Sequence, residues 1–277
     1  MRRGAHWAAI GLALMALTTT AGAQDARIRL QHHRAAGDRW TVTSSSDMTI
    51  VFEQAGAVAE GSASEESTYQ CILQKAEDGR FTITVAGKTT SRTDGLPGAP
   101  PEEERVRSPM TFVQDTAGQV VSARPAPFEP NPDDPFDLEA WVDYAFDQIA
   151  PLRVLPAGEV EAGDEWTGEQ ALKLPDGSEV LAKSTYRLVA YDAAFRRAYI
   201  SEEFLAPLAI DINNGGIRAS ATGQVSVTSV DTFDVQAGRV TRGRGAMSMR
   251  LTVRIDAMGQ EFSIRMMGLG TRNYSVQ

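Results

Sequence analysis

The feature that most limits how this chain can fold is a strict alternation of apolar and polar residues. Near the C-terminal end, every second residue is apolar in the run Met247, Met249, Leu251, Val253 and Ile255. Successive side chains of a β-strand point to opposite faces, so this pattern predicts a strand with one face on a core and the other in water. The same period of two extends from Trp40 to Phe52. We therefore expect a mainly β, antiparallel protein.

Three short motifs occur twice in the same order. They are Gly37-Asp38-x-Trp40 and Gly163-Asp164-x-Trp166, Ser67-Thr68-Tyr69 and Ser184-Thr185-Tyr186, and Ala117-Gly118-Gln119-Val120 and Ala237-Gly238-Arg239-Val240. Turns that contain Gly and Asp are common in any all-β chain, so each match is weak alone and convergent turns remain an alternative. Their shared order favours an internal repeat of one β unit.

A single amphipathic helix is expected between the two copies. Asp134 can cap it, Pro135 suits its first position, and Pro151 ends it. We predict two tandem antiparallel curved-sheet units, each like half a barrel, joined by this helix. The expected boundaries are 24–124 for the first unit, 125–156 for the linker with a helix at about 135–150, and 157–277 for the second unit. Within the first unit, Ala55–Ala63 reads as a connection and Thr93–Pro109, rich in proline, as an exposed loop.

The N-terminal residues predict export from the cytoplasm. Met1–Ala23 has a basic start, a short apolar run and an Ala-Gly-Ala cleavage site, which are typical of a signal peptide. Removing it leaves 25 Lys and Arg against 36 Asp and Glu, a net charge of −11. This charge argues against nucleic acid and anionic lipid surfaces as partners. We expect a periplasmic or extracellular protein that does not span a membrane after cleavage.

Few residues offer catalytic or metal chemistry. Cys71 is the only cysteine and lies in an apolar alternation, so we expect it to be buried and without a disulfide. His32 and His33 are adjacent, so on a strand they would point to opposite faces and could not share a metal. Asp211–Gly216 lacks the bidentate Glu of a calcium loop and reads as a turn. We assign no catalytic, cofactor-binding or metal-binding residue, although a pair of carboxylates needs no fixed spacing.

The large apolar side chains suggest a binding surface instead. Candidate residues for an apolar groove are Trp40, Trp141, Trp166, Met247, Met249 and Met266. Methionine adapts to varied apolar partners, although an ordinary sheet core is the simpler interpretation. The favoured hypothesis is a non-catalytic exported protein that binds an apolar ligand, such as a lipid, or an envelope partner. The alternatives are a structural or protein-interaction module without a cavity, and a carboxylate-based hydrolase.

The second unit carries a resemblance to a known family. Val160, Gly163, Asp164 and Trp166 have the spacing V-x-x-G-D-x-W and follow Pro156 and the predicted helix. In an exported β-rich chain, this resembles a family of secreted bacterial β-rich proteins without an assigned function. The predicted architecture is also loosely similar to the open barrels of periplasmic lipoprotein carriers. These resemblances imply residence in the cell envelope and a β-rich fold, and they carry over no catalytic residue.

Overall fold

One large antiparallel sheet dominates the protein. The computed structural model describes residues 27–95, 102–128, 144, 148–149, 151–214, 217–257 and 260–277. Eleven strands form the large sheet, and two short strands pair separately. The strands are β1 (Ile28–Arg29), β2 (Arg39–Gln54), β3 (Ala57–Glu77), β4 (Arg80–Asp94), β5 (Glu102–Asp115), β6 (Val120–Arg124), β7 (Glu159–Val160), β8 (Glu165–Lys173), β9 (Glu179–Asp192), β10 (Arg197–Asn214), β11 (Ile217–Asp234), β12 (Arg239–Ala257) and β13 (Gln260–Val276).

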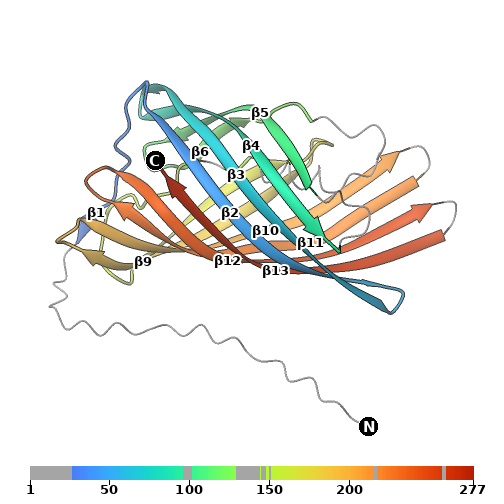
Figure 1. The fold of residues 1–277 in the computed structure, drawn as a ribbon. Coiled ribbons are helices and arrows are strands. Elements are labelled where there is room, and N and C mark those ends of the chain that lie inside the picture. Colours follow the sequence, from blue (N-terminus) through green and yellow to red (C-terminus); the bar gives the residue numbers. More distant parts are fainter. Residues whose placement is uncertain are drawn as a thin grey trace, which may run out of the picture.

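The two halves of the chain share this sheet. Its strand order is β6-β5-β4-β3-β2-β13-β12-β11-β10-β9-β8, so the first strand of one half lies beside the last strand of the other (Figure 1). β2 and β13 pair from Val42 with Val276 to Gln54 with Ile264. The prediction of a mainly β antiparallel protein is confirmed, but the prediction of two tandem half-barrels joined by a helix is wrong. Direct pairing satisfies backbone groups that two separate sheets would leave exposed at their edges.

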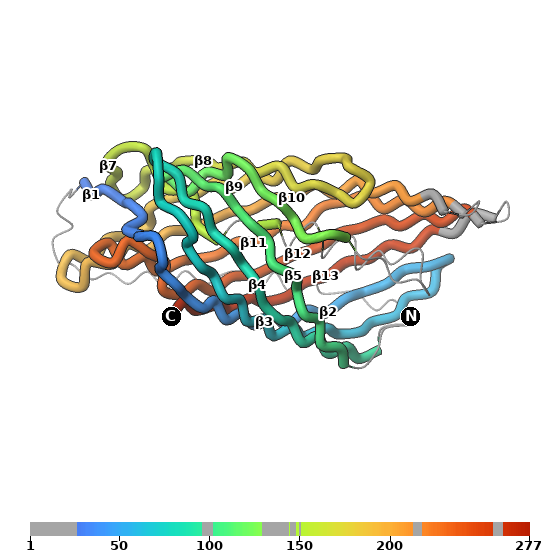
Figure 2. Tube along the Cα trace, turned by 90° about the horizontal axis from the view of Figure 1, so that it is seen from above, coloured from blue at the N-terminus to red at the C-terminus, as the bar shows by residue number. Residues whose placement is uncertain are grey.

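The sheet coils until it nearly closes into a barrel. In the view from above, β4 and β5 pass across the strands of the second half (Figure 2). The edge strands are β6 and β8, and a bridging segment, described at residues 148–149 and 151–155, contacts both edges. On one side, Leu155 N donates to Ala117 O at 2.6 Å, and on the other, Trp166 Nε1 donates to Val154 O at 2.8 Å. This segment therefore bridges the seam of the sheet.

The predicted helix at about 135–150 falls largely outside the described residues. Tyr144 is helical, and Gln148 and Ile149 belong to a turn and a bend. Trp141 and the signal peptide predicted at 1–23 also lie outside the described residues. The expectation that Trp141 is buried therefore stays a prediction.

Alternating side chains divide the sheet into an inner and an outer face. On β10, the buried inner residues include Ile200, Glu202, Ala206, Leu208 and Ile210. Inner residues gather into clusters at the two ends of the sheet. One cluster combines Trp40, Leu73 and Ile83 with Leu152 of the bridging segment. Another combines Leu172, Ile210 and Val253. The outer face carries hydroxyl-bearing and charged residues together with exposed apolar ones, among them Leu205, Val230 and Leu269.

Strands extend further than the sequence suggested in two places. Ala57–Glu77 is continuous, so the expected connection at Ala55–Ala63 is wrong beyond the turn at Ala55 and Gly56. β5 begins at Glu102, so the second half of the expected loop Thr93–Pro109 is also strand. Exposed ion pairs accompany this extension, since Arg92 lies 3.6 Å from Glu102, and Lys88 lies 3.4 Å from Glu104. The glutamates that indicated an exposed loop lie on β5 and pair with basic residues of β4.

The two Gly-Asp turns make the same hydrogen bonds. Gly37 N donates to Leu73 O at 2.8 Å, and Leu73 N donates to Asp38 O at 2.9 Å. The corresponding bonds at the second turn join Gly163 N to Leu188 O at 2.7 Å and Leu188 N to Asp164 O at 3.0 Å. Each turn thereby fixes the start of one strand against its neighbour. The internal repeat itself stays a prediction.

Candidate functional site: the inner face of the sheet

Strand register sorts the inner face into a polar band and an apolar area. One row across the sheet reads Ser67, Ser44, Tyr274, Gly243 and Asp231. The next row reads Glu65, Ser46, Arg272, Gly245, Ser229 and Glu202. The rows that follow are apolar, beginning with Ala63, Met48, Gly270, Met247 and Val227. A polar band therefore crosses the middle of the inner face, and an apolar area lies between it and the hairpin tips.

Arg153 is the centre of the polar band. Its Nη1 lies 3.0 Å from Glu202 Oε2, and its Nε lies 3.1 Å from Asp231 Oδ2. Its Nη2 donates to the Tyr274 hydroxyl at 3.3 Å. Both carboxylates are almost fully buried, at 3% and 2% exposure. The bridging segment thus supplies the cation that compensates two acids on the sheet wall.

The acids have further hydrogen bonds. Ser184 Oγ donates to Glu202 Oε1 at 2.9 Å, and Ser229 Oγ donates to Asp231 Oδ1 at 3.3 Å. Burial lowers the pKa of Arg153, but the charges of Glu202, Tyr274 and Asp231 outweigh it, so the pKa lies well above its usual value. Burial raises the pKa of Tyr274, and the opposing effect of the Arg153 charge is smaller. The group is therefore a paired, buried ion cluster.

Two glutamines position the bridging segment. Gln114 Nε2 donates to Gly118 O at 2.5 Å and to Leu152 O at 3.0 Å, and Leu152 N donates to Gln114 Oε1 at 3.3 Å. At the other edge, Gln148 Nε2 donates to Lys173 O at 2.6 Å, and Lys173 N donates to Gln148 Oε1 at 3.0 Å. A side-chain amide offers the same donor and acceptor as a peptide group. Both glutamines therefore substitute for strand pairing at the seam.

His32 supports the same segment from the end of the barrel. Its Nε2 lies 2.8 Å from Arg153 O and, as the donor, fixes the tautomer with hydrogen on Nε2. Burial lowers the pKa of His32 to about 4. The hydrogen bond to Arg153 O opposes this change, and the charge of Arg34 adds a smaller lowering. The neutral imidazole is thus the form built into the fold. His33 bonds separately to Gln236 O at 3.1 Å, so the two histidines have different surroundings.

A small cavity of about 40 Å³ lies against the ion cluster. Its lining includes Arg153, Glu202, Ser184, Tyr186 and Gly168. A cavity of this size with polar walls suits one or a few water molecules. It is too small for an organic substrate, since ligand pockets usually exceed about 300 Å³.

Four methionines dominate the apolar area. Met48 on β2, Met247 and Met249 on β12, and Met266 on β13 all point to the inner face and are half-buried. Gly268 lies between Met48 and Met249, and a Cβ atom there would come within 2.5 Å of Met48 Sδ. The absence of a side chain at Gly268 lets the thioether of Met48 pack over the strand there, next to Met249. Flexible thioethers therefore form this part of the inner face.

The residues predicted for an apolar groove fall into several places. Trp40 is 3% exposed and packs at one end of the inner face with Leu73 and Ile83. Trp166 lies near the seam, stacked on Tyr186 with ring centroids 5.8 Å apart. The structure brings together only the methionines, of which Met249 and Met266 pack against Leu251. Sequence reasoning missed Arg153, Glu202 and Asp231, although each acid interrupts an apolar alternation.

The structure also describes Cys71 and most of the expected turn at Asp211–Gly216. Cys71 is a free, buried thiol, as predicted. Strand β10 extends to Asn214, so most of the turn expected at Asp211–Gly216 is strand. Within the described ranges, no three His, Cys, Asp or Glu side chains are grouped to hold a metal ion. The same part of the chain contains no helix long and apolar enough to cross a membrane.

Comparisons with known proteins add little to this geometry. No protein-family model matches the chain, and no curated protein matches it. A solved structure of OmpF from Salmonella typhi in complex with daunomycin is similar over 88% of this chain and 100% of that chain. Its TM-score is 0.26 and its sequence identity is 8%. At this level, the similarity carries no functional argument.

Proposed function

We propose that this protein is a non-catalytic binding protein that holds an apolar ligand, such as a lipid acyl chain, on the inner face of its sheet. The observation that carries the proposal is the group of four half-buried methionines around Gly268 and Gly270. Thioether side chains are flexible and polarizable, so they can pack against apolar ligands of different shapes. Apolar side chains that keep some exposure gain free energy when a ligand removes them from water.

The distribution of polarity between the two faces supports this arrangement. The inner face is apolar around Met249 and Leu251, whereas outer positions on the same strand carry Arg250 and Arg254. A barrel wall in contact with lipid has the opposite arrangement, with an apolar band outside and polar residues inside. We therefore expect water on the outside of the sheet and the ligand on the inside. Export, as predicted from residues 1–23, would place such a carrier in the periplasm or outside the cell.

The test uses an apolar fluorescent probe, N-phenyl-1-naphthylamine, with the purified chain. Met249→Gln introduces an amide into the apolar area, and we expect the probe to bind about tenfold more weakly because the amide loses hydrogen bonds to water. Met267→Gln is the matched control, since Met267 lies on the outer face and is 48% exposed. Native mass spectrometry of the unsubstituted protein would identify any lipid that co-purifies.

Two results would contradict the proposal. The first is that the unsubstituted protein neither binds the probe nor carries a lipid. The second is that Met267→Gln weakens probe binding as much as Met249→Gln does, because binding would then not depend on the inner face. Circular dichroism spectra of both variants would show whether each retains the β fold.

A further inference from the structure

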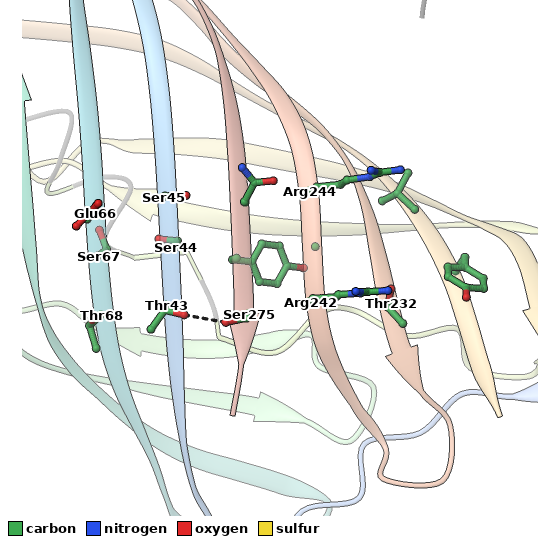
Figure 3. A pocket seen from close by; sticks show the side chains of 15 residues that line it. Thr43, Ser44, Ser45, Glu66, Ser67, Thr68, Thr232, Arg242, Arg244 and Ser275 are labelled. Atoms are coloured by element: carbon green, nitrogen blue, oxygen red, sulfur yellow. Dashed lines mark hydrogen bonds between the residues drawn. The ribbon is translucent and has the colours of Figure 1, made fainter. Parts of the chain in front are cut away.

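The outer face contains a hollow that is separate from the methionine area. It has a volume of about 790 Å³ and crosses β3, β2, β13, β12, β11 and β10 (Figure 3). Most of its wall consists of short polar side chains, among them Thr43, Ser45, Thr68 and Thr232. Thr43 Oγ1 and Ser275 Oγ form a hydrogen bond of 2.8 Å across two strands. The hollow thus presents rows of hydroxyl groups held at strand spacing.

Two arginines lie side by side in this hollow. Arg242 and Arg244 are two residues apart on β12, so both point to the outer face, about 7 Å apart along the strand. Both side chains are exposed. Within the described part of the chain, neither has an ion-pair or hydrogen-bond partner. Elsewhere on the outer face, Arg92 and Arg265 do have acidic partners, at 3.6 Å and 3.5 Å.

The residues across the neighbouring strands explain why this pair lacks a partner. Arg242 lies opposite Ser275 and Thr232, and Arg244 lies opposite Asn273 and Val230. The acid in the lining, Glu66, is three strands away from Arg244, about 14 Å at ordinary strand spacing. Two unpaired cations on a chain with a net charge of −9 form a local site for an anion.

A second hollow of about 510 Å³ continues along the same strands. It is lined by the next outer residues of β2, β3 and β13, including Thr49, Ser64 and Thr271, and by Arg92 and Asp94 of β4. Asp47, also in its lining, is two residues beyond Ser45 of the first hollow. The two hollows are lined by successive outer positions of β2, β3 and β13, and they are together called the outer groove below. An elongated ligand that is rich in hydroxyls and places an anionic group at the arginine pair, away from Asp47 and Asp94, would match this lining.

We propose that this outer groove binds an anionic carbohydrate chain, with Arg242 and Arg244 on its carboxylate or sulfate groups. A guanidinium group can donate two parallel hydrogen bonds to such an anion. The hydroxyl and amide groups of Thr43, Ser45 and Asn273 can exchange hydrogen bonds with sugar hydroxyls, because each can donate and accept. This site is independent of the proposed apolar ligand, so either proposal can fail without the other.

The experiment measures binding of three polysaccharides to the full chain by calorimetry. Polygalacturonate carries carboxylates, dextran sulfate carries sulfates, and dextran is the neutral probe. We expect at least one anionic probe to bind, and dextran to bind much more weakly. Arg242→Gln with Arg244→Gln should weaken anionic binding about tenfold or more, since two charge-assisted contacts are lost.

The matched control is Arg250→Gln with Arg254→Gln. These arginines are on the same strand and the same face but do not line the groove, and the change in net charge is the same. The proposal requires this control to bind almost normally. It is overturned if neither anionic probe binds, if the control loses as much affinity as the groove variant, or if dextran binds as well as the anionic probes. Tighter binding of a single-stranded thymidine oligonucleotide would also overturn it, because the preferred ligand would then be a nucleic acid.

Discussion

Arg153 and Asp231 form a salt bridge of 3.1 Å across 78 residues of sequence, between the segment that bridges the seam and the wall of the sheet. Asp231 is 2% exposed, so its charge depends on this partner. Glu202, on the neighbouring strand, depends on the same guanidinium. Closure of the sheet is therefore coupled to the burial of charge on its inner face.

Removing the guanidinium should destabilise the protein strongly. In Arg153→Met, both buried carboxylates lose their cation, and we expect a loss of about 3–5 kcal/mol in the free energy of unfolding. Urea denaturation followed by circular dichroism would measure it. The control is Arg27→Met, because Arg27 and Glu161 form an exposed pair at 3.7 Å that should contribute less than about 1 kcal/mol.

A triple variant separates the effect of the uncompensated charges from the effect of the lost Arg153 side-chain contacts. Adding Glu202→Gln and Asp231→Asn to Arg153→Met removes the uncompensated charges, so part of the lost stability should return. If the triple variant is less stable than Arg153→Met, the two acids are not the source of the loss, and the account of the cluster is wrong.

His32 predicts a specific dependence of stability on pH. Its pKa is about 4 in the folded protein and near 6.5 in the unfolded chain, so between these values only the unfolded chain binds the proton. The contribution of His32 is therefore complete above pH 6.5 and is lost as the pH falls towards 4. Between pH 7 and pH 4.5 the loss should be about 2 kcal/mol.

Comparison with His32→Gln isolates this contribution. Glutamine keeps an N–H donor for Arg153 O but does not titrate in this range. Asp115 and Arg34, the charged neighbours that act on His32, stay in place. Chemical denaturation at several pH values should show a flatter profile for the variant. Equal slopes for the two proteins would mean that other groups cause the acid sensitivity.

Cys71 should be inert in the folded protein. It is 1% exposed, and burial raises the pKa of its thiol to about 12. Because the thiolate is the reactive form, iodoacetamide at pH 8 should modify Cys71 only after denaturation. Mass spectrometry with and without urea measures this. Rapid modification without urea would show that the cluster around Trp40 opens in solution.

The sequence predicted the faces of the strands better than their arrangement. The alternation from Trp40 to Phe52 and from Met247 to Ile255 correctly assigned the residues that point inwards, because side-chain period follows from strand geometry alone. The pairing of Val42 with Val276 could not be predicted, since no local pattern relates two strands at opposite ends of the chain. That single pairing decides between one sheet and two.

The ion cluster could not be predicted from the sequence for a similar reason. Arg153 meets Glu202, Asp231 and Tyr274 only after the sheet coils, and their sequence separations range from 49 to 121 residues. One local signal was present, because Glu202 and Asp231 occupy inner positions where the alternation calls for apolar residues. A charge at such a position needs a partner, but sequence alone does not say which residue provides it.

Gly243 provides a test of how tightly this cluster is packed. A Cβ atom there would overlap the Tyr274 ring and Asp231 Oδ1, so Gly243→Ala must displace a partner of Arg153. We expect a loss of about 1–3 kcal/mol in the free energy of unfolding, as for overpacked cores. Gly158→Ala is the control, because a Cβ atom at Gly158 meets nothing within 4 Å, and a shift of at most about 1 kcal/mol in either direction is expected. Tyrosine fluorescence should also change in Gly243→Ala alone. If both variants unfold at the same urea concentration as the unsubstituted protein, the inner face at β12 and β13 is looser than this geometry requires.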